Sequence, residues 1–179
     1  TAYRRQRQMC IRDRSSCGGK QKAMGEAITE RDSLPVMTTL GVTTLISDSG
    51  VTRYRVNTEE WMMYDRKKPS YWAFEKGVYM EQFDSIFNVE ASIKADTAYY
   101  YDKERLWKLI GNVDIQNRKG ERFNTELLYW NEATQKVYSD KFIRIQQPDR
   151  IITGHGFDSN QQMTIYTIRN ICLLYTSDS

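Results

Sequence analysis

Short runs of alternating apolar and polar residues fill the chain from residue 36 onward. Residues 38–47 are rich in β-branched side chains, and residues 51–56 alternate apolar or aromatic side chains with arginine. The Asp48-Ser49-Gly50 sequence between them is a turn signal, so the two runs predict a β-hairpin. Residues 57–65 fit a helix and a strand equally well.

The rest of the chain continues as a series of short strands separated by polar turns. Further runs with strand character cover residues 71–74, 78–83, 88–94, 97–101, 106–116, 122–130, 136–146, 150–157 and 163–168. No apolar run approaches the ~20 residues that a membrane-spanning helix needs. Strands of this length and spacing predict an all-β fold, either a sandwich, a barrel or a jelly roll.

A weak internal repeat links these strands. The segment 113–117 resembles the segment that begins at Ile143, and the segment 98–100 resembles the one that begins at Leu128, both at an offset of 30 residues. One unit would hold two strands and two turns. Stacked hairpin units of this kind bury a shared apolar face that a single unit cannot bury alone.

The alternation assigns side chains to the two faces of each strand, because residues two apart point the same way. One face of the strand at 106–116 carries Trp107, Leu109, Val113 and Ile115. The equivalent face of the strand at 136–146 carries Val137, Ile143 and Ile145. Such a face must pack against something. The sequence leaves open whether it lines a closed core or a groove that accepts a ligand.

The two ends differ from the middle. Residues 1–14 and 172–179 look like translated sequencing adapter, which we set aside as a scar. The alternative for residues 1–14 is a basic arm that binds nucleic acid, although no aromatic residues are interspersed with its arginines. The whole chain has a net charge of +3, but residues 15–171 alone have 21 basic and 21 acidic residues. The absence of net charge over residues 15–171 argues against nonspecific nucleic-acid binding.

Few residues could carry chemistry. With the ends set aside, Cys17 is the remaining cysteine and His155 the only histidine. We therefore expect no disulfide, no metal site and no catalytic residue. The protein is expected to have no cofactor and not to be an enzyme. Gly154 and Gly156 flank the histidine and predict a bulge or a close backbone approach. Residues 15–35 are interpreted as a tether. Small residues precede Cys17, as in a lipoprotein signal, so Cys17 is either a lipid anchor or an ordinary free cysteine.

The order of motifs resembles the LptC family, the inner-membrane-anchored periplasmic components of lipopolysaccharide export. The segment 50–54 is similar to the opening strand of that family, and the segment 74–84 to its F-x-x-G-x-Y-x-E-x-F-D motif. The segments Ala95-Asp96-Thr97-Ala98-Tyr99 and Gly111-Asn112-Val113 match two further motifs, and ITGHGF at 152–157 matches the closing one. Many relatives begin with a membrane-spanning helix, whereas this chain has Cys17.

The resemblance implies an open, twisted antiparallel β-jelly roll over residues 36–171, built of repeated hairpins. It implies a non-catalytic periplasmic carrier, anchored to the inner membrane, that takes lipopolysaccharide from an ABC transporter. The expected partners are the lipid A acyl chains, an LptA-like bridge protein and the β-domains of the transporter, with no nucleic acid. The expected lipid-binding groove comprises Val78, Met80, Trp107, Leu109, Val113, Ile115, Phe123, Ile143 and Ile145. The alternative is a closed β-sandwich lipoprotein that acts as a structural adaptor in the envelope.

Overall fold

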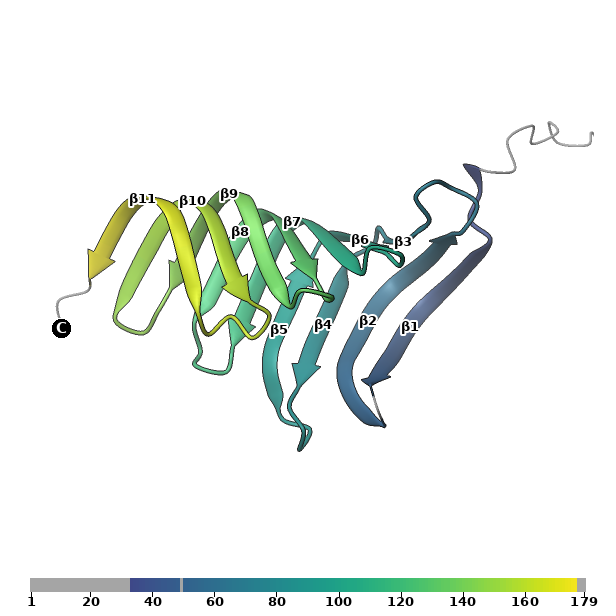
Figure 1. Cartoon of the computed structure of the whole chain (residues 1–179), viewed down its shortest axis with the longest axis horizontal. Coiled ribbons are helices and arrows are strands. Elements are labelled where there is room, and N and C mark those ends of the chain that lie inside the picture. Colours follow the sequence, from purple (N-terminus) through teal and green to yellow (C-terminus); the bar gives the residue numbers. More distant parts are fainter. Residues whose placement is uncertain (1–32, 49, 177–179) are drawn as a thin grey trace, which may run out of the picture. The chain divides into compact units, whose positions relative to one another are not determined.

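Eleven β-strands make up the described part of the protein, residues 33–48 and 50–176 of a computed structural model (Figure 1). The strands are β1 (Met37–Asp48), β2 (Val51–Tyr64), β3 (Tyr71–Phe74), β4 (Val78–Phe83), β5 (Val89–Ala95), β6 (Thr97–Tyr101), β7 (Leu106–Asn117), β8 (Arg122–Asn131), β9 (Lys136–Gln146), β10 (Arg150–Asn160) and β11 (Tyr166–Thr176). Residues 1–14 and most of the tether, Cys17 included, lie outside the described residues.

All pairings between the strands are antiparallel, and they form one sheet in the order β11-β10-β9-β8-β7-β5-β4-β2-β3-β6, with β1 beside β2. The predicted hairpin of residues 38–47 and 51–56 is confirmed as β1 and β2. The ambiguous residues 57–65 belong mostly to β2, which runs unbroken to Tyr64.

The sheet folds back on itself, because the long strands change partner halfway along. One edge of β7 pairs with β6 over Leu106–Ile110 and with β5 over 114–117, and a single residue, Asp96, separates β5 from β6. In the same way β2 pairs with β4 over 54–58 and with β3 over 62–64. Each long strand therefore contributes to two layers, as in an open jelly roll.

We call the level at which the strands turn from one layer to the other the bend line. In Figure 1 the strands β7–β11 arch over at this level. The first layer contains β3, β6 and residues 61–64, 106–110, 128–131, 136–139, 157–160 and 166–168. The second layer contains β4, β5 and residues 42–46, 51–58, 113–117, 122–125, 143–146 and 150–155.

Residues with left-handed backbone make the bend in β7. Gly111 and Asn112 have φ values of 79° and 46°, and the register with β8 shifts there. The Asp96 amide donates a hydrogen bond to the Gly111 carbonyl (3.0 Å), and the Asn112 side-chain amide donates one to the Asp96 carboxylate (2.6 Å). A Cβ on residue 111 would lie 3.0 Å from that carboxylate, so glycine suits both the backbone and the space.

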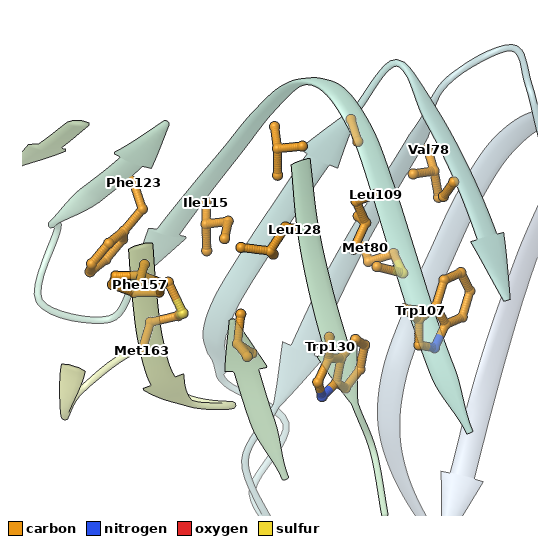
Figure 2. Packing of buried hydrophobic residues seen from close by; sticks show 14 of the residues in the cluster. Val78, Met80, Trp107, Leu109, Ile115, Phe123, Leu128, Trp130, Phe157 and Met163 are labelled. Carbon is orange, nitrogen blue, oxygen red and sulfur yellow. The ribbon is translucent and has the colours of Figure 1, made fainter. Parts of the chain in front are cut away.

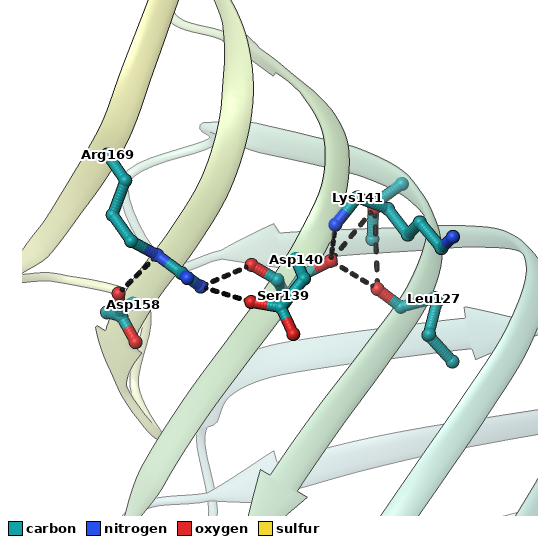
Figure 3. Close-up of polar contacts among 7 residues, drawn as sticks. Leu127, Ser139, Asp140, Lys141, Asp158 and Arg169 are labelled. Atoms are coloured by element: carbon teal, nitrogen blue, oxygen red, sulfur yellow. Dashed lines mark hydrogen bonds and ion pairs between the residues drawn. The ribbon is translucent and has the colours of Figure 1, made fainter.

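Side chains satisfy the backbone groups that the bend exposes in β8–β11 (Figure 3). The buried Ser139 hydroxyl donates to the Leu127 carbonyl (2.6 Å) and accepts from the Lys141 amide (3.1 Å). Arg169 of β11 crosses to β10 and β9, where it pairs with Asp158 (3.1 Å) and Asp140 (2.8 Å). It also donates to the Ser139 carbonyl (2.8 Å). These bonds hold three strands at the same level of the bend line.

The apolar inner faces of the two layers pack into one core (Figure 2). Its largest fully buried side chains are Trp107, Phe123, Phe157, Leu109, Ile115, Leu128, Ile143, Ile145 and Met163. The alternation predicted for β7 and β9 is confirmed, because every residue assigned to the apolar face is buried and Arg144 on the opposite face is exposed. The predicted open, twisted jelly roll built of repeated hairpins is likewise the observed fold.

The last strand differs most from its prediction. The sequence predicted a strand over 163–168, but β11 begins at Tyr166 because Asn160 holds the preceding residues in a turn. Its side-chain oxygen accepts hydrogen bonds from the amides of Thr164 (2.9 Å) and Ile165 (3.1 Å). β11 then continues to Thr176, beyond the domain boundary expected at residue 171.

The close approach predicted at Gly154 is present, and it provides a test of the packing between β10 and β11. A Cβ on residue 154 would lie 2.5 Å from the Asn170 carbonyl oxygen, which is backbone and has little room to move. We expect Gly154→Ala to lower the free energy of unfolding by about 1–3 kcal/mol. The control, His155→Ala, changes an exposed neighbour and should cost about 0.5 kcal/mol or less. Urea denaturation followed by circular dichroism compares the two, and equal losses would contradict the proposed contact.

Candidate functional site: the space between the two layers

The nine residues expected to line a lipid groove all lie on the inner face of the folded sheet. Trp107 and Leu109 come from the first layer, and Val78, Met80, Val113, Ile115, Phe123, Ile143 and Ile145 come from the second. Their side chains are 0–3% exposed and belong to one apolar cluster. The structure therefore brings all nine together, in a packed interior between the layers.

The end of this interior near β11 is closed by hydrogen bonds between the layers. The Asn117 side-chain amide in the second layer donates to the Met163 carbonyl (2.9 Å). Met163 lies in the turn between β10 and β11, next to the first layer. The Gln147 amide donates to the Tyr166 hydroxyl (2.8 Å), and both contact the Glu121 carboxylate. Met163 itself is 1% exposed and fills the end of the core. Polar bonds and a buried side chain together make this the sealed end.

The opposite end, near β1, is apolar and partly open. A small pocket with about 20 Å³ of free space, enough for roughly one water molecule, lies there between the layers. We call this end the mouth. Its lining from the second layer is Val42, Thr44, Ile46, Val56 and Thr58, and its lining from the first layer is Trp61, Trp72, Phe74 and Trp107. Side chains at the mouth such as Val42, Thr44 and Trp61 are only half-buried.

A continuous row of aromatic rings forms the first-layer wall of the mouth. Trp61 packs on Trp72, Trp72 on Tyr100 and Tyr100 on Trp107, with ring centroids 4.7–5.0 Å apart. Glu132 fixes the inner end of the row, because its carboxylate accepts hydrogen bonds from the Trp107 indole (2.8 Å) and the Tyr100 hydroxyl (3.3 Å). Burial, and then the nearby Glu132 charge, raise the pKa of Tyr100 to about 12, so its hydroxyl stays a donor.

Of the residues that line the mouth, Trp107 alone was among the predicted site residues, although the sequence contains a signal for the others. Val42, Thr44 and Ile46 alternate along one face of β1, as in a strand that covers an apolar surface. Trp61 falls in the segment whose secondary structure was ambiguous, so its face could not be assigned. The pairing of Trp61 with Thr39 of β1 depends on the register of a long hairpin, which no local pattern specifies.

Two strands of the described sheet pair on one edge only. β1 pairs with β2 alone, and β11 pairs with β10 alone. Both carry exposed apolar side chains, with Leu40 of β1 68% exposed and Ile171 of β11 65% exposed. An unpaired edge presents backbone N–H and C=O groups that can pair with a strand of another protein.

Reactive groups are sparse over the same residues. No group of three or more His, Cys, Asp or Glu side chains that could hold a metal occurs in the described part. His155 is exposed on the outer face, where it packs edge-on against Phe142 (5.4 Å). Residues 33–48 and 50–176 contain no helix long and apolar enough to cross a membrane.

The folded sheet and its interior define an open β-jelly roll with an apolar space between two layers of antiparallel strands. The family model described as lipopolysaccharide-assembly, LptC-related matches residues 31–170, and the chain belongs to this LptC family. Members of this family are components of lipopolysaccharide transport, which agrees with the resemblance in the sequence motifs. No curated protein matches the chain.

The interior and the mouth should differ in what they contribute to stability. Ile115 is 0% exposed in the core, whereas Ile46 is 36% exposed at the mouth. We expect Ile115→Ala to lower the free energy of unfolding by about 2–5 kcal/mol, because it leaves a cavity. Ile46→Ala should cost less than about 1 kcal/mol, because the side chain is already partly in water. Urea denaturation of both variants tests this, and equal costs would mean that the mouth is as tightly packed as the core.

Proposed function

We propose that this protein carries lipopolysaccharide, with the acyl chains of lipid A held between the two layers. The carrier makes and breaks no bond: it accepts lipid from an inner-membrane ABC transporter and passes it to a β-jelly-roll bridge protein. The observation that supports this function best is the apolar mouth at the β1 end, whose walls are β-branched on one side and aromatic on the other.

Entry of an acyl chain requires the layers to separate at the mouth, because the free space there is only about 20 Å³. Two features favour separation at this end. β1 pairs with β2 alone, so no second strand holds it in place. The end near β11 is held by the Asn117–Met163 and Gln147–Tyr166 hydrogen bonds. Each methylene that moves from water into the mouth contributes about 0.8 kcal/mol, so a few methylenes offset a partial opening.

The free edges of β1 and β11 are the surfaces we propose for the protein partners. Strand addition to an exposed edge supplies main-chain hydrogen bonds, and a jelly roll that docks this way extends the apolar interior of its neighbour. We propose that one edge receives the β-domains of the transporter and the other the LptA-like bridge protein. The periplasmic face of the inner membrane, with Cys17 as a lipid anchor, is the location that fits this order.

The alternative, a structural adaptor with a sealed interior, is favoured by one observation. All nine residues expected to line the groove are at most 3% exposed, as in an ordinary core. In that case the exposed edges would bind envelope proteins and no lipid would enter.

A substitution at the mouth distinguishes a carrier from an adaptor. Thr44 lies on the inner face of β1 at the mouth, whereas Thr38 pairs with Met62 on the outer face. We expect Thr44→Arg to weaken lipopolysaccharide binding at least tenfold, because the long cation occupies the acyl path. Thr38→Arg makes the same change on the same strand and should bind like the unmodified protein. The measurement is the displacement of fluorescent lipopolysaccharide by unlabelled lipid A, with folding checked by circular dichroism.

One result would contradict the carrier function, and another would contradict the site proposed for the lipid. One is a well-folded protein that shows no saturable, lipid A-competed binding. The other is Thr44→Arg that folds and binds as tightly as Thr38→Arg. The first result would favour the adaptor, and the second would place the lipid away from the mouth.

Site-specific photocrosslinking tests the two edges. We expect a crosslinker at Leu40 of β1 and one at Ile171 of β11 to capture different purified partners, the transporter β-domains and the bridge protein. A crosslinker at Ile86, which is 77% exposed in the turn between β4 and β5, is the control and should capture neither. Capture of both partners at Ile86 as efficiently as at the edges would argue against strand addition.

A further inference from the structure

A second, polar groove crosses the outer surface of the second layer, on the side of the sheet away from the core. It consists of two depressions, of about 630 and 590 Å³, that share Lys94 and Asp96. We propose that this groove binds an uncharged oligosaccharide in an extended conformation. The proposal does not depend on lipid binding, because the side chains that carry it, such as Tyr79, Lys94 and Phe142, do not line the mouth, which shares only Val42 and Thr58 with the outer groove.

The strand register shows that the groove runs across the strands. Asn57 of β2 pairs with Tyr79 of β4, which pairs with Lys94 of β5. The row continues from Lys94 to Asp114 of β7, and then through β8 to Arg144 of β9. Strands lie about 4.8 Å apart, which is close to the length of one sugar unit in an extended chain. Successive side chains of the row can therefore meet successive sugars.

Exposed aromatic rings stand along the groove. Tyr79 is 39% exposed in one depression, and Phe142 is 47% exposed in the other and is backed by His155. They lie four strands apart, about 19 Å at the usual strand spacing. An aromatic ring that remains in water can stack on the C–H face of a sugar, as aromatic rings pack on other flat apolar surfaces. Flanking polar groups then hydrogen-bond the hydroxyls.

The polar lining has free hydrogen-bonding capacity. Among the described residues, the Lys94 ammonium, the Arg144 guanidinium and the Glu126 carboxylate have neither a hydrogen bond nor an ion pair. Positively charged donors and a negatively charged acceptor therefore line the same groove. The hydroxyls of a sugar both donate and accept hydrogen bonds, so a lining that offers donors beside acceptors suits them.

The mixture of charges decides between ligand classes. Cations such as Lys94 and Arg144 are interspersed with the acids Asp96, Asp114 and Glu126. A nucleic acid or another polyanion would meet as many repulsive carboxylates as attractive cations, and its binding rests on concentrated positive charge. The binding of a neutral chain through hydrogen bonds and stacking does not depend on the ratio of cations to carboxylates. The groove is therefore built for a neutral polyhydroxylated chain.

The test is an isothermal titration of the full 179-residue chain with chitohexaose and cellohexaose, two uncharged hexasaccharides. We expect at least one to bind saturably, and the double variant Lys94→Ala/Phe142→Ala to weaken binding at least tenfold. The matched control is Lys136→Ala/Phe87→Ala, which removes an exposed lysine and an exposed phenylalanine outside the groove and should stay within twofold. Circular dichroism confirms that both double variants fold.

Three outcomes would overturn the proposal: neither hexasaccharide binds at millimolar concentration, the groove variant binds like the control, or only the polyanion polygalacturonate binds. The lipid experiment stays separate. Thr44→Arg should keep full hexasaccharide binding, and the groove variant should keep full lipopolysaccharide binding. Loss of one activity without the other therefore shows which of the two proposals has failed.

Discussion

The bend line is the constraint on which the rest of this structure depends. A twisted antiparallel sheet that is apolar on one face can bury that face only against another surface, and here the sheet buries it against itself. The hydrogen-bond ladders require neighbouring strands to bend at the same level, because a strand that stayed straight would lose its partners on both sides. Gly111 and Asn112 supply the left-handed backbone, and Asp96, Ser139 and Arg169 satisfy the exposed polar groups.

The same bend makes the two ends of the interior unequal. At the β11 end, the turn that carries Met163 folds over the core and bonds to Asn117, so separating the layers there would break buried hydrogen bonds. At the β1 end, the layers meet through aromatic and β-branched side chains such as Trp61 and Val42, which lose only contact area when they part. An apolar ligand that enters between the layers restores most of the apolar contact area that is lost. Opening from the β1 end is therefore the less costly motion.

The sequence predicted most of the fold because its alternation is local and strict. β3, β4, β6 and β9 begin and end where the pattern placed them, and the apolar faces of β7 and β9 were assigned correctly. The mouth could not be predicted in the same way. It depends on the register between β1 and β2 and on the side to which Trp61 points, and both follow from pairing across the whole hairpin. The start of β11 was missed because Asn160 holds a turn through its side chain.

Core packing explains the inner face of the second layer but not the aromatic residues Tyr79 and Phe142, which are exposed. Asp96 and Asn112 serve the bend, and Asp114 pairs with Arg122, so polar residues on the outer row follow from the fold. Tyr79 and Phe142 contribute little to the core, since each keeps more than a third of its surface in water. A fold that needed only a solvated outer face would be served by any polar residue at these positions. Their place on a transverse polar groove is accounted for by a ligand that presents flat apolar faces between hydroxyl groups, and an oligosaccharide is such a ligand.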